Sequence, residues 1–390
     1  MTRNVAFLAA FWSAAPQAAG QTPDTVRMHL LWEVAEGKHQ VADSLGELSG
    51  IALDSGGNVY VSDFSAMKLW VFDRNGRSLP GIGRKGRGPG EFEAPTGLGI
   101  GPDGRLYVRD LARVSRFAPD PATGRLTRYE SAFRGPAMAD WRSMLATRFD
   151  ASGRLYYPGF NMVDRSRRTG WYFRYAATGA LVDSLEVLAF PNAPSATAHV
   201  RLSATGGRML RGLNHVPFAP LPTWDVTPRG TLITGDGQSY LIRETDRAGR
   251  EVQRYRREVP PDRIPPRQRQ DSVAALRARL DSVPVPLDRV EGMPPEVRSV
   301  RLPEMFPAYM AVYAATDGRV WVRRWPTGNS DRTIFDVFEP DGRLRSVVVL
   351  PRAIAVSPTP ALSLAGVAAV GVDPETGANT VLRFAATPPG

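Results

Sequence analysis

A short segment recurs along the chain: an apolar run, a tight turn that contains glycine, and a second run of β-branched and aromatic residues. Clear copies read GIALDSGGNVYVSD (50–63) and GLGIGPDGRLYVRD (97–110). Two such runs joined by a short turn are typical of a β-hairpin. One glycine aligns at the turn in five copies, where a positive φ costs glycine little. These glycines are Gly57, Gly104, Gly153, Gly230 and Gly318.

Each hairpin is followed by two more strand-like runs, as in LWVFDRNGRSLPGI (69–82). The unit is therefore four antiparallel strands in about 45 residues, the size of a propeller blade. A less regular sixth unit covers 367–384, and the strand-like Val26–Val34 has no unit of its own. Joining the two would hide the sheet edges that an open array exposes. We expect an all-β fold: a six-bladed β-propeller of four-stranded antiparallel blades, closed by the N-terminal strand in the last blade.

Two segments interrupt the repeat. Residues 260–306 are rich in proline and predict an insert between blades four and five, with a short helix over Arg267–Asp281. Its apolar residues at spacings of three and four predict a face docked on the propeller. A second long connection, Leu188–Leu221, contains His199 and His215 and is expected to run over one face of the molecule.

The N-terminus has the pattern of a secretory signal peptide. Arg3 precedes the apolar run VAFLAAFWSAA (5–15), which is too short to span a bilayer, and small residues follow at 18–20. We interpret 1–20 as a signal peptide and 21–390 as a periplasmic or secreted propeller. A poorly ordered N-terminus and a retained membrane anchor are the alternatives. The chain has no cysteine, which excludes disulfides and thiolate metal sites.

The formal net charge is +10, carried almost entirely by arginine. Such a balance is compatible with a polyanion site, but the arginines are spread along the chain, which favours a solvated basic surface. A nucleic-acid partner is disfavoured by the export signal.

The run GIGRKGRGPGEFEAPTGLGIGPDGRLYV (81–108) resembles the repeat of NHL-type six-bladed propellers. The layout over 26–386 also resembles secreted bacterial six-bladed β-propeller proteins, in which a proline-flanked helical insert precedes a segment like 302–322. This resemblance implies the fold and export. It implies little chemistry, because most members of that group have no assigned reaction.

The glycine-rich loop at 81–90 is the first candidate site. Its backbone amides, with Arg84, Lys85 and Arg87, suit an anion. A P-loop would need a following helix, whereas a strand follows here, so a structural connection with Phe92 wedged between sheets is the alternative. Asp63 and Asp110, which end two strands, are expected to cap neighbouring backbone amides.

A second candidate is a calcium site. The opening LGELSGIALDSGGNVYVSD (45–63) is similar to calcium-dependent lactonase propellers, a resemblance that implies Glu47 as a metal ligand in the central channel. Asp225 offers the one further carboxylate at the matching strand starts. Calcium takes six to eight oxygen ligands, so a strand-end role for Glu47 is the alternative.

A third candidate combines aromatic and basic residues. Trp325 beside Arg323 and Arg324 could stack on a sugar or peptide at a channel mouth, although packing between blades explains most tryptophans in strands. Arg109 completes the candidate ligand-binding residues, which are Arg84, Lys85, Arg87, Arg109, Arg324 and Trp325.

The sequence thus favours a monomeric exported scaffold without a cofactor. It would bind a protein, a carbohydrate or an acidic small molecule at one face of the central channel. The alternative is a calcium-dependent lactonase- or lyase-like hydrolase with Glu47 and Asp225 at the metal.

Overall fold

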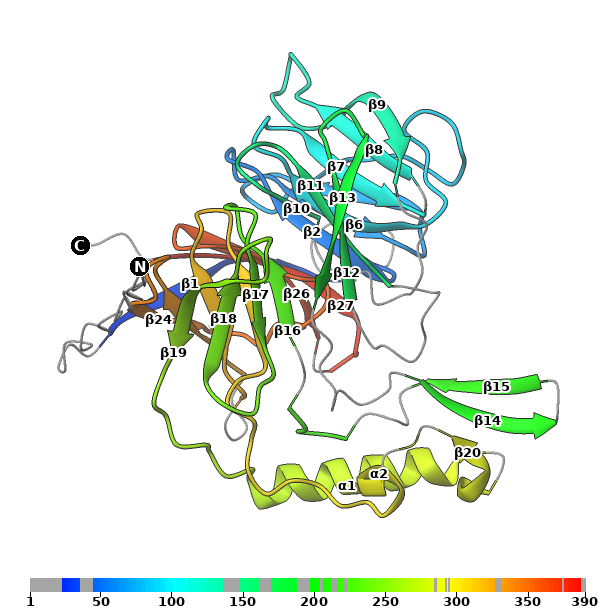
Figure 1. Ribbon diagram of the computed structural model, residues 1–390. Helices are drawn as coiled ribbons and strands as arrows, with labels where there is room; N and C mark the ends of the chain where they lie inside the picture. Colours follow the sequence, from blue (N-terminus) through cyan, green and yellow to red (C-terminus); the bar gives the residue numbers. More distant parts are fainter. Residues whose placement is uncertain are drawn as a thin grey trace, which may run out of the picture.

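A computed structural model gives the fold of the chain (Figure 1). The residues that it describes are 23–35, 45–111, 113–135, 147–160, 170–187, 197–203, 206–211, 216–220, 223–283, 286–291, 293, 295–326, 331–373 and 375–386. The predicted signal peptide, His39 and His215 lie outside these residues.

Antiparallel four-stranded sheets repeat along the chain, each ordered as its strands occur in the sequence. The first is β2 (Leu48–Leu53), β3 (Val59–Asp63), β4 (Lys68–Phe72) and β5 (Ser78–Ile82). The second is β6 (Pro95–Ile100), β7 (Leu106–Asp110), β8 (Arg113–Ala118) and β9 (Arg128–Arg134). The third is β10 (Arg148–Phe149), β11 (Leu155–Phe160), β12 (Gly170–Tyr175) and β13 (Leu181–Val187). The fourth is β16 (Thr223–Val226), β17 (Leu232–Gly235), β18 (Leu241–Thr245) and β19 (Glu251–Arg256). The predicted all-β class and its four-stranded antiparallel sheets are confirmed.

An eight-stranded sheet joins the two ends of the described chain. It contains β21 (Ala311–Ala314), β22 (Val320–Arg323), β23 (Thr333–Phe338), β24 (Leu344–Leu350), β25 (Ala361–Ser363), β26 (Gly366–Val372), β27 (Asn379–Ala386) and β1 (Asp24–Val34). β1 pairs antiparallel with β27 and, through its first four residues, parallel with β24. The pairing with β24 was not predicted. It follows from the length of β1, whose first residues cover the edge of β24.

The turns explain why the repeat folds in this way. The five glycines aligned from the sequence all have positive φ, between 71° and 86°. At Gly57, φ is 86° and an added Cβ would lie 3.1 Å from the Cβ of Arg74. A side chain there would strain the backbone and crowd the neighbouring turn.

The core lies between consecutive sheets. Phe92, Leu98 and Phe117 pack in a cluster between the sheets that begin with β2 and β6, which also contains Tyr60. Other clusters fill the spaces between the later sheets, and one of them packs β26 and β27 against the first sheet. A further cluster lies between the two halves of the eight-stranded sheet. Aspartates of the strand-connecting turns accept hydrogen bonds from strand tyrosines, as in Tyr60–Asp54 at 2.9 Å and Tyr107–Asp103 at 2.8 Å. These tyrosines are therefore part of the framework.

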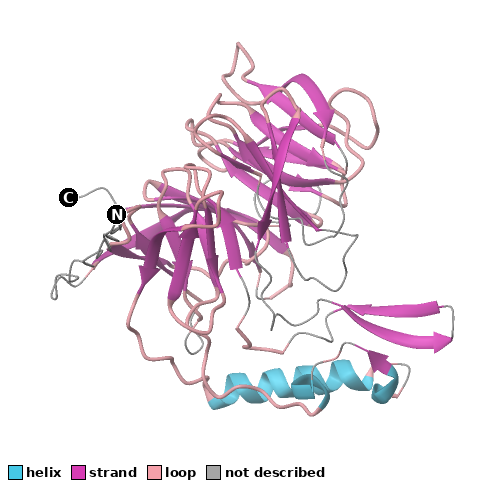
Figure 2. Ribbon diagram, viewed as in Figure 1, coloured by secondary structure: helices cyan, strands magenta, loops and turns pink. Residues whose placement is uncertain are grey.

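The helices of the helical segment lie to one side of the four-stranded sheets (Figure 2). This segment consists of α1 (Pro266–Asp281), a 3-10 turn η2 (Leu287–Arg289) and α2 (Pro295–Arg298). Proline at the first helical position suits the start of α1, because its missing N–H would have no partner there. β14 (Thr197–Ser203) and β15 (Gly206–Arg211) form a hairpin, and β14 pairs with β20 (Val290–Glu291). The connection 188–221 therefore contacts the helical segment.

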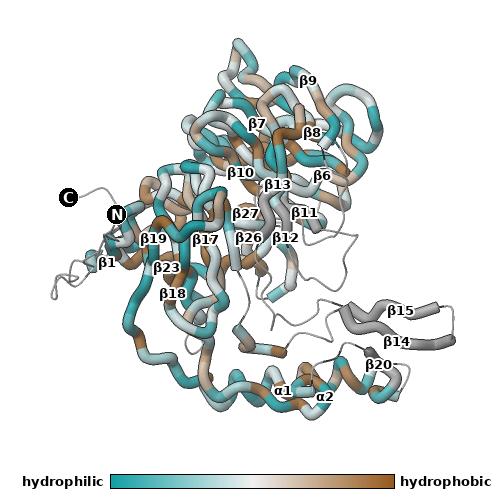
Figure 3. Tube along the Cα trace, viewed as in Figure 1, coloured by the Kyte–Doolittle hydropathy of each residue, from teal (hydrophilic) through white to brown (hydrophobic). Residues whose placement is uncertain are grey.

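α1 buries one side against its own segment. Leu276 and Leu280 pack with Val297 and Phe306 in a cluster that also takes in Phe218. The hydropathy of α1 accordingly alternates along the helix between hydrophilic and hydrophobic residues (Figure 3). In the described part of the chain, no helix is long and apolar enough to cross a membrane.

Candidate functional site

The glycine-rich loop is closed by its own contacts. The Glu91 carboxylate accepts a hydrogen bond from the Gly88 amide at 2.9 Å and one from Arg84 Nε at 2.9 Å. The Gly86 amide bonds to the Phe92 carbonyl at 2.9 Å. The Gly88 and Arg84 hydrogen bonds hold the pKa of Glu91 below its ordinary value. A carboxylate of the chain therefore occupies the place that a bound anion would take.

The basic residues of this loop face solvent. Arg84 and Arg87 have side chains 83% and 85% exposed, and Arg87 pairs with Glu93 at 2.7 Å. Lys85 forms a backbone bridge to Phe92. Phe92 is fully buried, with its ring centroid 6.1 Å from that of Phe117. These contacts favour the structural interpretation of the loop.

Asp63 and Asp110 cap backbone amides, as predicted. Asp63 accepts hydrogen bonds from the amides of Gly46, Ser65 and Ala66. Asp110 accepts from the amides of Glu93 and Ala94, at 2.9 and 2.5 Å.

Arg109 is buried, with 2% of its surface exposed. Its guanidinium lies 5.1 Å from the ring centroid of Tyr157. Burial lowers the pKa of Arg109, although Tyr157 and Tyr175 oppose the shift. The side chain lies in the packing of β7 and not on an accessible surface.

Arg324 and Trp325 lie where the helical segment meets the sheet of β21–β24. The buried Asp336 carboxylate receives hydrogen bonds from Arg324, Arg257 and Tyr240, so Arg324 is held in place. The Trp325 ring is stacked on Phe306, with centroids 5.5 Å apart. Trp325 thus anchors the helical segment.

The Asp225 carboxylate, one of the two proposed calcium ligands, is engaged by other groups of the chain. Both Asp225 oxygens bond to Arg148, at 2.7 Å from Nε and 2.5 Å from Nη2, and Asp225 also accepts the Ala314 amide at 2.9 Å. A calcium ion would have to displace this partly buried pair. Glu47 is exposed, and its backbone bonds to Ser65 and Phe64. Among the described residues, no three His, Asp or Glu side chains form a group that could hold a metal ion.

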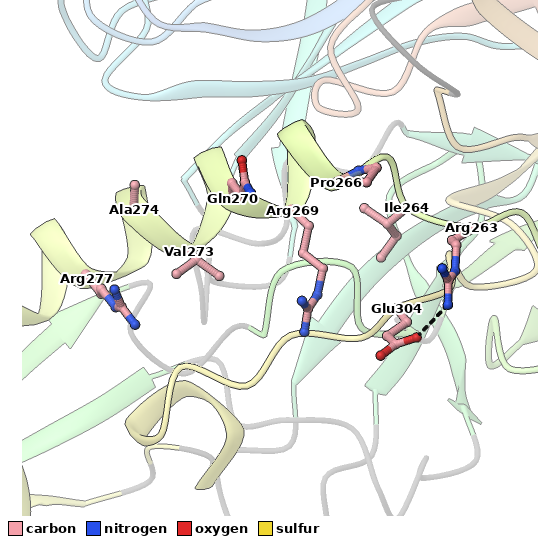
Figure 4. A pocket seen from close by; sticks show the side chains of 9 residues that line it. All are labelled: Arg263, Ile264, Pro266, Arg269, Gln270, Val273, Ala274, Arg277 and Glu304. Atoms are coloured by element: carbon pink, nitrogen blue, oxygen red, sulfur yellow. Dashed lines mark hydrogen bonds and ion pairs between the residues drawn. The ribbon is translucent and has the colours of Figure 1, made fainter.

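A groove along α1 was not predicted from the sequence. It encloses about 580 Å³ and is open to solvent (Figure 4). One wall of the groove is a stripe of α1 whose residues are three and four positions apart. The other wall comes from the extended segments just before α1 and near residue 304. The lining residues are Arg263, Ile264, Pro266, Arg269, Gln270, Val273, Ala274, Arg277 and Glu304. We call this site the α1 groove.

The α1 groove carries three arginines and one carboxylate. Arg263 pairs with Glu304 at 3.0 Å. Arg269 donates from Nη2 to the Leu302 carbonyl at 3.0 Å and from Nε to the Pro303 carbonyl at 3.2 Å, which fixes its guanidinium without neutralising it. Arg277 is exposed, and within the described residues no carboxylate pairs with it or with Arg269. The groove is therefore positively charged.

Comparison with known proteins identifies the repeat. Residues 44–115 match the family described as 6-bladed beta-propeller. The predicted resemblance to six-bladed β-propeller proteins is confirmed, and the likeness to NHL-type repeats is only approximate. Among curated proteins nothing matches.

Solved structures with a similar chain path are remote in sequence. A member of the duf4221 family from Bacteroides vulgatus is 10% identical, with a TM-score of 0.47, covering 94% of this chain and 99% of that chain. Virginiamycin B lyase from Staphylococcus aureus is 10% identical, with a TM-score of 0.43, covering 91% and 99%. Likenesses this remote carry no information on activity.

Proposed function

We propose that this chain is an exported six-bladed β-propeller that binds an anionic ligand in the α1 groove. The observation that carries the proposal is the groove itself, where arginines outnumber carboxylates by three to one. Such a concave site attracts negative charge through the summed field of its cations. The proposed site is on the helical segment and contains none of the residues that the sequence suggested for a site at one face of the central channel.

Contacts between neighbouring sheets support a closed ring. The amide of Thr147, just before β10, bonds to the carbonyl of Leu98 in β6. Arg148 of the third sheet pairs with Asp225 of the fourth. Asn379 of β27 donates to the Gly46 carbonyl at 2.6 Å, beside the first sheet. We infer that β25, β26, β27 and β1 form the sixth blade, and that 260–306 is an insert between blades four and five.

Export rests on the composition of residues 1–20, and cell fractionation tests it. The full chain is expected outside the cytoplasm with about 20 residues removed, whereas a chain that starts at Gln21 stays inside. Recovery of uncleaved full chain in the cytoplasm would contradict export.

A thermal-shift titration of residues 21–390 tests the binding function. The probes are hexaglutamate, a hexamer of galacturonate, and neutral maltohexaose. Binding to the folded state raises Tm with ligand concentration. We expect a rise with at least one anionic probe, little with maltohexaose, and loss of the rise in Ala274→Glu, which adds a negative charge at an exposed position of the groove. No rise with either anion, or an unchanged rise in Ala274→Glu, would contradict the proposal.

Calcium chemistry is not favoured by the donor set described above. Asp225 is engaged by Arg148, and in the part of the chain that the structure describes no three His, Asp or Glu side chains are grouped so that they could hold a metal ion.

A further inference from the structure

The α1 groove has an internal spacing that indicates the kind of anion it takes. Arg269, Val273 and Arg277 are successive members of one helical stripe, each four residues after the last. Figure 4 shows their side chains leaving α1 toward the same side. The helix rises 1.5 Å per residue, so the two arginines are about 12 Å apart along its axis with the valine midway.

An extended peptide reproduces this spacing. Its residues rise about 3.3 Å each, and alternate side chains point to one face. Carboxylates four residues apart on one face are therefore about 13 Å apart, with one side chain between them. Two acidic residues would meet Arg269 and Arg277, and an aliphatic residue between them would meet Val273.

The lining of the groove favours a peptide over an acidic sugar. Its apolar members are Ile264, Pro266, Val273 and Ala274, and none of the nine lining residues is aromatic. Sugar rings are usually held against aromatic faces, whereas an aliphatic surface suits an aliphatic side chain. The aromatic residues packed with this segment, Phe218, Phe306 and Trp325, contact one another and do not line the groove.

We propose that the ligand of the α1 groove is an extended acidic peptide segment with the pattern Glu-x-Val-x-Glu, or its aspartate and aliphatic equivalents. This inference rests on the proposed function, because it specifies the anion that the groove binds. Arg269 and Arg277 bind the two carboxylates, and Val273 contacts the central side chain.

Two isomeric peptides test the spacing. One is acetylated and amidated Glu-Ala-Val-Ala-Glu, and the other is Ala-Glu-Val-Glu-Ala with the same end groups. Their composition and charge are identical, but only the first places both carboxylates and the valine on one face of an extended chain. In calorimetry with residues 21–390, we expect the first peptide to bind about tenfold more tightly than the second. This corresponds to a difference in binding free energy of about 1.4 kcal/mol.

Two charge reversals on the same helix test the location. Arg277→Glu removes a cation of the groove. Arg267→Glu makes the same change of net charge at an exposed position outside the lining. We expect Arg277→Glu to weaken the first peptide about tenfold and Arg267→Glu to weaken it clearly less, because the Arg267 side chain does not line the groove and acts on the peptide only through solvent. Melting temperatures of both variants confirm that each is folded.

The outcomes separate this inference from the proposed function. Equal binding of the two isomers, or equal weakening by the two reversals, would overturn the inference. If galacturonate hexamer binds in the groove and neither peptide does, the peptide inference fails and the binding function stands. If no anion binds, both fail.

Discussion

Two arginine-rich regions of this molecule differ in what neutralises them. In the loop at 81–92, Arg84 pairs with Glu91 and Arg87 pairs with Glu93. In the α1 groove, Glu304 pairs with Arg263, while Arg269 is fixed by carbonyl groups and Arg277 faces solvent. The sequence of the loop suggests an anion site more strongly than the sequence of α1 does. In the structure, however, the Glu91 carboxylate of the loop itself takes the place of a bound anion. Density of arginine in a sequence is therefore a poor guide to a site, because the fold decides which cations are left for a ligand.

The largest expected effect concerns stability. Phe92→Ala removes a fully buried ring from the packing between two sheets, which costs about 3–5 kcal/mol of unfolding free energy. Val273→Ala, at a half-buried position of the groove, is expected to cost about 1 kcal/mol or less. Urea unfolding measures both. An equal loss of unfolding free energy in the two variants would mean that the groove is packed as tightly as the loop. The contrast between a closed loop and an open groove would then fail.

A second prediction turns the loop into an anion site. Glu91→Gln removes the internal carboxylate while leaving Arg84 and the Gly88 amide in place. We expect sulfate to raise the Tm of this variant by a few degrees more than that of the parent chain. Glu93→Gln is the matched control, since Glu93 pairs with Arg87 and accepts no amide of the glycine-rich loop. An equal sulfate response in the two variants would contradict the account.

The smallest effect is a dependence on pH. The folded pKa of Glu91 lies below the ordinary 4.5, because the Gly88 amide and Arg84 favour the carboxylate. Its contribution to stability is therefore complete above the unfolded pKa and is lost as the pH falls through the lower folded value. An NMR titration of the Gly88 amide should have its midpoint below 4.5. The midpoint should rise in the Arg84→Ala variant and remain unchanged in the Arg87→Ala variant. A rise in both variants, or in neither, would mean that the hydrogen bond from Arg84 is not the cause of the lowered Glu91 pKa.

The repeated strands were predictable because the signals are local. Alternating apolar residues, and glycines such as Gly57 and Gly104 at positive φ, lie within each hairpin. The caps formed by Asp63 and Asp110 were predictable for the same reason. The parallel pairing of β1 with β24 was not, because the sequence pattern assigned the N-terminal strand to the last unit alone and gave no sign of a second partner.

The groove could not be predicted because its parts are separated along the chain. Arg263 and Glu304 meet across 41 residues. The four-residue spacing of Arg269, Val273 and Arg277 can be read from the sequence. Which side of α1 stays open depends on the residues that bury Leu276 and Leu280, and these come from distant parts of the chain. The sequence analysis proposed Arg324 and Trp325 as ligand-binding residues. In the structure Arg324 pairs with Asp336, and Trp325 stacks on Phe306 of the helical segment.

One measurement tests the contrast between the two regions directly: arginine labelling of residues 21–390 with phenylglyoxal, read by mass spectrometry residue by residue. It is done with and without the peptide Glu-Ala-Val-Ala-Glu. The account predicts that the peptide slows labelling of Arg277 and leaves Arg84 and Arg87 unchanged. Protection of Arg84 or Arg87, or equal protection of all three, would contradict the claim that the groove is open to an anion and the loop is closed.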